Sequence, residues 1–97
     1  MEIQSIPEAF QTKLRVSILS ALLLGEQSFK ELKEITASTD GNLGAQLSKL
    51  EDMGYLVSKK EFVKRKPRTS YRLTEFGITT FKEYVQMLED LLKNSQC

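Results

Sequence analysis

The chain has 97 residues, of which 40% are hydrophobic and 28% charged, and its formal net charge is +1. This length and balance predict one folded domain rather than a disordered segment. We expect the protein in the cytoplasm, because its sequence has no membrane-spanning run, no signal peptide and only one cysteine. Histidine is absent and the single cysteine is Cys97, so we expect no enzyme, no cofactor, no metal site and no internal disulfide. The chain contains no run of about 18 apolar residues that could span a membrane. Its opening, MEIQSIPEAF, lacks the features of a signal peptide.

Two amphipathic helices are predicted in the first third of the chain. The first covers residues 7–24, with Pro7 in its first turn, apolar residues at helical spacing and Gly25 at its end. A short second helix follows Ser28, which can form a capping box with Glu31. Its buried face would consist of Phe29, Leu32 and Ile35.

A third helix is predicted from about residue 40 to 53, capped by Thr39 or Asp40 and ended by Gly54. One side carries an apolar stripe of Leu43, Leu47 and Leu50, and the other carries Asn42, Ala45, Gln46 and Lys49. Asn and Gln can pair with adenine, Lys with guanine, and Ala can contact a thymine methyl. Polar residues also face water on any surface helix, so the pattern indicates base reading only in a DNA-binding fold. A helical wheel puts Gln46 nearest the leucine stripe.

After the third helix the pattern changes to β-strands. Residues 55–57, 62–63 and 69–73 favour extended structure, and the last of these alternates with Thr69, Tyr71 and Leu73 on one side. Between the strands lies Lys64-Arg65-Lys66-Pro67-Arg68. Because proline has no N–H to give to a ladder, we expect Pro67 in the connecting turn and not in a strand. The prediction is a two-stranded hairpin with a basic tip.

Positive charge is concentrated on this hairpin. Residues 59–72 hold seven of the fourteen Lys and Arg residues and one carboxylate, Glu61, for a net charge of +6. Cations on a protruding hairpin can displace the counterions condensed on duplex DNA. The alternative is a solvated turn whose charge serves solubility.

A long amphipathic helix is predicted at the end of the chain, capped by Thr74 and extending to about residue 94. Its apolar stripe consists of Phe81, Tyr84, Val85, Leu88, Leu91 and Leu92. Twenty helical residues span about 30 Å, roughly the width of a small domain. We therefore assign all six residues to a dimer interface and expect a second copy of the chain to cover the far part of the stripe. The alternative is that the stripe packs on its own domain.

The order of helix, helix, helix, hairpin and helix predicts a winged helix-turn-helix, mainly α with a small β-hairpin (α+β). Four stretches resemble the winged-helix transcriptional regulators of the MarR/ArsR-like superfamily, and most closely its small stand-alone DNA-binding proteins of bacteria and archaea. They are LRVSIL at 14–19, FKEL at 29–32, TDGNL at 39–43 with GYL at 54–56, and PRTSYRLT at 67–74 followed by Gly77. Together they cover about residues 12–92.

The resemblance implies one domain over residues 1–97, with a helix-turn-helix at about 28–53, a wing at about 55–73 and a dimerisation helix at about 74–94. It implies a transcriptional regulator that binds double-stranded DNA as a homodimer, the third helix in the major groove and the wing on the backbone or minor groove. The base-reading residues would be among Gly41, Asn42, Ala45, Gln46 and Lys49, and the wing contacts would be Lys64, Arg65, Lys66 and Arg68.

Two features set the sequence apart from other members of that superfamily. It lacks the cysteines and histidines of the metal sensors and the additional helices that hold small-molecule effectors. The alternative function is a winged-helix protein-interaction module that does not read DNA and whose basic wing meets an acidic partner.

Overall fold

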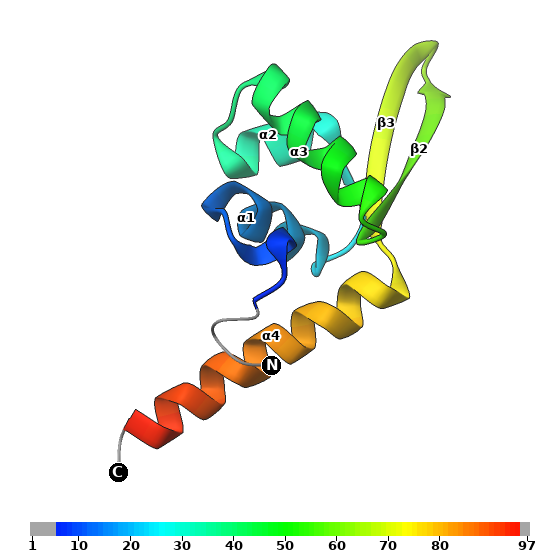
Figure 1. The fold of residues 1–97 in the computed structure, drawn as a ribbon. Helices are drawn as coiled ribbons and strands as arrows, with labels where there is room; N and C mark the ends of the chain where they lie inside the picture. Colours follow the sequence, from blue (N-terminus) through cyan, green and yellow to red (C-terminus); the bar gives the residue numbers. More distant parts are fainter. Residues whose placement is uncertain (1–5, 96–97) are drawn as a thin grey trace.

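The computed structural model, which describes residues 6–95, is a three-helix core carrying a β-hairpin and a long C-terminal helix (Figure 1). Its elements are the 3-10 turn η2 (Glu8–Phe10), α1 (Lys13–Leu22), β1 (Gln27–Ser28), α2 (Phe29–Thr36), α3 (Asp40–Asp52), β2 (Leu56–Val63), β3 (Lys66–Leu73) and α4 (Glu75–Ser95). The strands form one antiparallel sheet in the order β1-β3-β2. This is the predicted winged helix, mainly α within an α+β architecture. Cys97 lies outside the described residues.

The prediction of a single first helix over residues 7–24 is wrong, because the chain forms two helical pieces there. Pro7 has extended backbone angles and precedes η2. The backbone is extended again at Thr12, whose side chain accepts a hydrogen bond from the Arg15 N–H (3.2 Å) and so begins α1. The break allows Phe10 to turn into the core, where it is 5% exposed.

The helix-turn-helix is formed by α2 and α3, and both begin with the predicted caps. The Ser28 hydroxyl accepts from the Glu31 N–H (3.1 Å) while the Glu31 carboxylate accepts from the Ser28 N–H (3.0 Å), which is the capping box. Thr39, not Asp40, caps α3 by accepting from the Asn42 N–H (3.2 Å). The α3 leucine stripe is fully buried, whereas Ile35 of α2 is 54% exposed, so its predicted burial is wrong.

The wing differs from the prediction in its turn. Val63 pairs with Lys66, so the turn consists only of Lys64 and Arg65, and both have positive φ angles of 53° and 67°. Two residues with positive φ are the geometry of a type I′ hairpin turn, whose twist matches that of the strands.

Pro67 therefore lies inside β3, opposite Phe62, and its predicted place in the turn is wrong. The Val63–Lys66 pair closes the turn, and antiparallel pairs alternate between hydrogen-bonded and non-bonded. The next pair, Phe62–Pro67, is non-bonded, so the ladder loses nothing from the missing N–H of proline. The sheet also has a third strand that the sequence did not reveal, since β1 has only two residues, which pair with Tyr71 and Ser70.

The first half of α4 is fixed to the core by close packing. Thr74 caps the helix by accepting from the Gly77 N–H (3.0 Å). Gly77 lies so close to Tyr55 that a Cβ atom on it would overlap the Tyr55 carbonyl oxygen. Further along, the Tyr84 ring stacks on Phe10, with ring centroids 4.6 Å apart.

The second half of α4 leaves the body of the molecule (Figure 1), which gives overall extents of 58 × 25 × 21 Å. None of the helices within residues 6–95 combines the length and the apolar character that a bilayer crossing needs.

Candidate nucleic-acid interface

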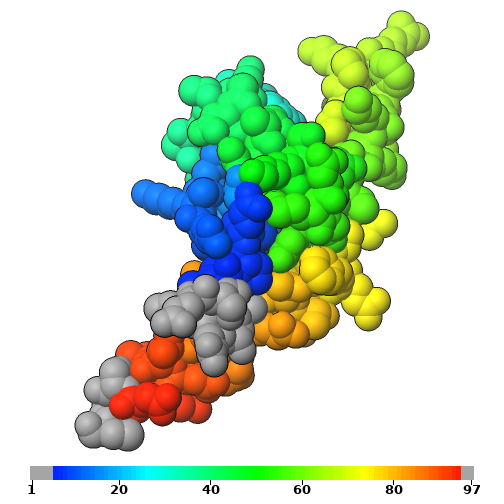
Figure 2. Space-filling model, in the orientation of Figure 1, coloured from blue at the N-terminus to red at the C-terminus, as the bar shows by residue number. Residues whose placement is uncertain are grey.

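The wing presents most of its cations without partners. Arg68 reaches Glu31 of α2 (3.1 Å), and Lys59 lies 3.5 Å from Glu61 on its own strand. Five other cations of the hairpin form no ion pair with any residue between 6 and 95: Lys60, Lys64, Arg65, Lys66 and Arg72. The hairpin extends beyond the helical body (Figure 2). The result is a projecting surface of uncompensated positive charge.

The predicted reading residues of α3 fall on two different sides of the helix. Gly41 and Ala45 are exposed and lie opposite the buried leucines, in one line with Ser48. This outward line holds only small side chains, so another molecule can approach the helix backbone closely. Ser48 was not among the predicted residues, although its spacing of i, i+4 and i+7 from Gly41 and Ala45 is visible in the sequence.

Gln46 and Lys49 lie on the flank of α3 that faces α1 and η2. The Gln46 Oε1 accepts a hydrogen bond from the Arg15 Nε (2.7 Å), and the Lys49 Nζ lies 2.7 Å from the Glu8 carboxylate. Arg15 is 7% exposed and also donates to the Glu8 carbonyl (3.0 Å). The two side chains are thus engaged within the domain, in a network that ties α3 to the N-terminal turn.

This network affects the acidity of Glu8. The hydrogen bond and the charge of Lys49, with a smaller contribution from Arg15, hold the pKa of the Glu8 carboxyl below its ordinary value. Glu8 is therefore ionised at neutral pH and keeps Lys49 close to the N-terminal turn.

Asn42 lies on the same flank as Gln46 but nearer the start of α3. Its side chain is exposed and borders a hollow of about 300 Å³, which is also lined by Lys13, Leu14, Ser17 and Thr36–Ser38. Its backbone N–H donates to the Thr39 hydroxyl, whereas its side chain forms no hydrogen bond with any residue between 6 and 95. The side-chain amide of Asn42 can therefore contact a ligand without disturbing the helix.

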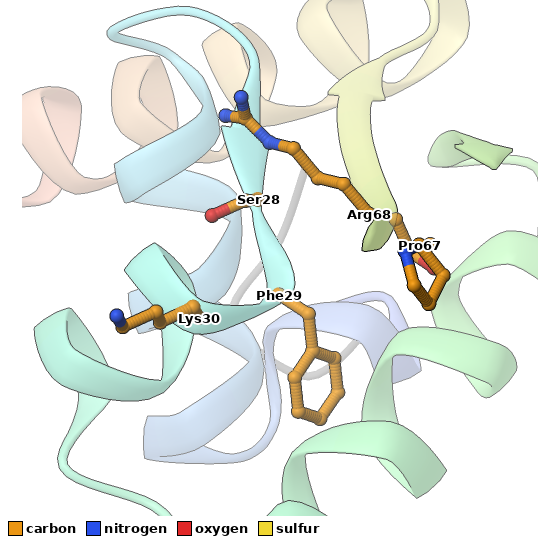
Figure 3. Close-up of a pocket in the computed structure, with 6 residues that line it drawn as sticks. Ser28, Phe29, Lys30, Pro67 and Arg68 are labelled. Atoms are coloured by element: carbon orange, nitrogen blue, oxygen red, sulfur yellow. The ribbon is translucent and has the colours of Figure 1, made fainter. Parts of the chain in front are cut away.

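A second hollow, of about 580 Å³, separates the start of α2 from the wing (Figure 3). Its lining is Ser28, Phe29, Lys30, Pro67, Arg68 and Thr69. Arg68 crosses to Glu31 at its rim, and the pKa of the Glu31 carboxyl is lowered mainly by its hydrogen bonds with Ser28 and further by Arg68. The hollow lies between the exposed surfaces of α2 and the wing. Lys30 contributes a cation to its lining, and this residue is not among the predicted DNA-binding residues.

The apolar stripe of α4 is divided between two environments. Phe81 is 7% exposed within the core, and Tyr84 packs against that core. Val85, Leu88, Leu91 and Leu92 are 38–60% exposed. The near part of the predicted stripe thus contacts its own domain, whereas the side chains of the far part stay partly exposed. No three His, Cys, Asp or Glu side chains gather in a metal-binding arrangement in the described part of the chain.

Comparisons with known proteins agree with this geometry. The family model described as "Winged helix DNA-binding domain" matches residues 14–92. The uncharacterised protein MJ0432 of Methanocaldococcus jannaschii is 40% identical over 90 residues, which cover 91% of this chain and 97% of that protein.

Two solved structures share the fold at low sequence identity. A protein of Enterococcus faecalis V583 assigned to the MarR family of transcriptional regulators is 21% identical, with a TM-score of 0.79 over 91% of this chain and 80% of its own. PadR of Bacillus subtilis, solved in complex with operator DNA, is 20% identical, with a TM-score of 0.65 over 71% of this chain and 44% of its own.

Proposed function

The chain belongs to the winged helix DNA-binding domain family, with a MarR-like fold, and on that premise we propose that it is a transcriptional regulator that binds double-stranded DNA as a homodimer. The observation that carries this proposal is the unpaired charge of the wing beside the open outward line of α3. Phosphate contacts dominate the affinity of proteins for duplex DNA. Five cations of the projecting hairpin form no ion pair in the described part of the chain and can supply such contacts, and α3 beside the hairpin offers side chains for base edges.

The proposed reading surface is the start of α3. Asn42 has a free amide for a bidentate contact with adenine, while Gly41 and Ala45 allow close approach in the major groove. Gln46 and Lys49 join this surface when DNA competes with Arg15 and Glu8 for them. The wing would take phosphates through Lys64, Arg65 and Lys66, with Arg68 at the edge of the hollow beside α2.

The proposed dimer contact is the far half of α4. Burying an apolar side chain of this size contributes about 1.5–3 kcal/mol, and Val85, Leu88, Leu91 and Leu92 are at least 38% exposed in the single chain. A second α4 would cover them. Sedimentation should show a dimer at tens of micromolar, and a chain with Leu88, Leu91 and Leu92 changed to Ser should sediment as a folded monomer. A monomeric unmodified chain would contradict the dimer.

The direct test of DNA binding is the anisotropy of a labelled duplex at several salt concentrations. If a dimer neutralises about 6–8 phosphates, the plot of log affinity against log salt should have a slope of about −5 to −7. Changing Lys64, Arg65, Lys66 and Arg68 together to Ala should weaken binding and flatten the slope. Lys82→Ala on α4 is the control and should leave the slope unchanged.

Two results would count against this function. A folded quadruple variant with an unchanged slope would remove the wing from the DNA surface. Absence of duplex binding by the unmodified chain at low salt would favour the protein-interaction alternative.

A further inference from the structure

One aromatic side chain of the wing, that of Phe62, is exposed to solvent. Phe62 is 78% exposed, more than any other aromatic residue between residues 6 and 95. It lies in β2, close to the turn, and its exposed surface shows that the hairpin does not need it for packing. Exposed apolar surface is unfavourable in water. Among the cations of a binding surface, such a side chain indicates an apolar contact with the partner.

The face of the hairpin that carries Phe62 can be identified from the strand alternation. Side chains at positions 56, 58, 60 and 62 share one face of β2. On this face Leu56 is buried in the core, and the Ser58 hydroxyl donates to the Glu51 carboxylate of α3 (3.1 Å). Phe62 therefore extends the face that contacts α3, beyond the point where the core ends. Phe62 and Ser58 thus share one face of β2.

Pro67 supports Phe62 from the neighbouring strand. The two residues are register partners, so they occupy the same face of the hairpin. Pro67 also lines the hollow opposite Phe29 and Lys30 of α2 (Figure 3). The ring of Pro67 cannot rotate away, because its φ angle is fixed by the pyrrolidine. Together they form an apolar ridge, defined here as Phe62 and Pro67.

Cations surround this ridge. Lys60 precedes Phe62 on the same face, and Lys64 and Arg65 form the adjacent turn. Cations on both sides of an apolar ridge match a groove of duplex DNA, where two rows of phosphates flank sugars and base edges. An aromatic ring gains nothing from phosphates, so its contact must be with the sugar and base surface between them.

We propose that Phe62, supported by Pro67, is an apolar wedge that the wing inserts into the minor groove of the bound duplex. This inference rests on the proposed function and adds to it a residue that contacts base steps. Apolar wedges in the minor groove partly unstack a base step and bend the duplex. Phe62 therefore favours DNA sites with a deformable pyrimidine–purine step beneath the wing. It gives the wing a preference for DNA sequence that phosphate contacts alone cannot provide.

Fluorescence tests the contact directly, because the chain contains no tryptophan. Phe62→Trp introduces a single reporter at the ridge, and its emission should be strongly quenched when saturating duplex is added, as expected for stacking on bases. Val63→Trp is the matched control. Position 63 is adjacent on the same strand but points to the opposite face, so its emission should remain close to that of the free protein.

Affinity and bending give the second test. Phe62→Ala removes an exposed side chain and leaves no cavity, so it should melt at the temperature of the unmodified chain. It should bind duplex about tenfold more weakly, with an unchanged salt slope and a smaller bend in a doubly labelled duplex. Val63→Ala should lose less affinity for duplex than Phe62→Ala does, and it should bend the duplex as the unmodified chain does.

Three results would overturn the wedge. The reporter at position 62 could keep its emission while anisotropy shows binding, or Phe62→Ala could bind and bend duplex like the unmodified chain; either result rejects the wedge and leaves the proposed function intact. Absence of any duplex binding by the unmodified chain would reject both, so the two failures are distinguishable.

Discussion

The Lys49 Nζ of α3 lies 2.7 Å from the Glu8 carboxylate of the N-terminal turn. Arg15 lies 3.6 Å from the same carboxylate and also binds Gln46, so one acidic side chain and one buried arginine hold the flank of α3. The consequence is twofold. The contact ties the flank of α3 to the N-terminal turn, and in the proposed function it holds Lys49 away from the phosphates of the DNA.

Replacing Glu8 by Gln should therefore strengthen binding to random duplex. The change removes a negative charge beside α3 and releases Lys49 for a phosphate, so the affinity should rise several-fold and the salt slope should steepen by about one unit. Glu26→Gln, at an exposed position between α1 and β1, is the control of equal charge. An equal gain in both variants would show that only net charge matters and that the contact with Glu8 does not restrain Lys49.

The acid stability of the domain should depend on Glu8 and Glu31. Both carboxyl groups have pKa values below the ordinary 4.5, since Lys49 stabilises one anion and the Ser28 cap stabilises the other. A depressed pKa in the folded state gives a stabilisation that is present above about pH 4.5 and is lost as the pH falls through the folded value. The melting temperature of a Glu8→Gln, Glu31→Gln variant should be lower than normal at pH 7, and the difference should shrink toward pH 3. A constant difference across this range would contradict the assignment.

Gly77 should not tolerate even one added methyl group. A Cβ atom there would overlap the Tyr55 carbonyl oxygen, so α4 would have to move away from the core. Gly77→Ala should lower the free energy of unfolding by about 1–3 kcal/mol in a urea titration, despite the higher helix propensity of alanine. Gly41→Ala is the matched control, since no atom lies within 4 Å of its added Cβ, and it should raise the stability by up to about 1 kcal/mol. Equal effects of the two changes would disprove the close contact.

Replacing the two residues of the wing turn should stabilise the fold and weaken DNA binding. Lys64 and Arg65 both have positive φ, a conformation that costs an ordinary residue about 1–2 kcal/mol. Changing the pair to Asn-Gly should raise the free energy of unfolding by about 1 kcal/mol and weaken duplex binding through the loss of two cations. Lys66→Gln, which lies in the strand, should weaken binding without the gain in stability. An Asn-Gly variant with unchanged affinity would show that the turn makes no contact with DNA.

The features predicted correctly from the sequence are those that depend on residues within one or two helical turns. The capping box of Ser28 and Glu31 and the leucine stripe of α3 are examples, because cap and periodicity determine these helices locally. The long amphipathic α4 and the basic hairpin were equally visible.

The features that the sequence did not reveal depend on register and on distant contacts. The missing N–H of Pro67 excludes it from most strand positions and so predicts it in the turn, and only the register with Phe62 shows that the ladder loses no hydrogen bond. The engagement of Gln46 and Lys49 depends on the docking of Glu8 beside α3, which no local pattern of α3 contains. A helical wheel alone therefore could not show which polar side chains of α3 are already engaged within the domain.

If α3 reads bases while the wing binds phosphates, variants of the two surfaces should respond differently to the sequence of the duplex, and a pair of affinities measured for each variant tests this. The preferred site is first selected from a random duplex library, and binding to that site is compared with binding to random duplex. Asn42→Ala leaves the hydrogen bond between its backbone N–H and the Thr39 cap in place. It should lose about 1–3 kcal/mol of binding free energy on the selected site and little on random duplex. Lys64→Ala should weaken both by a similar factor. If Asn42→Ala weakened both duplexes equally, or neither, the claim that the start of α3 reads bases would be contradicted.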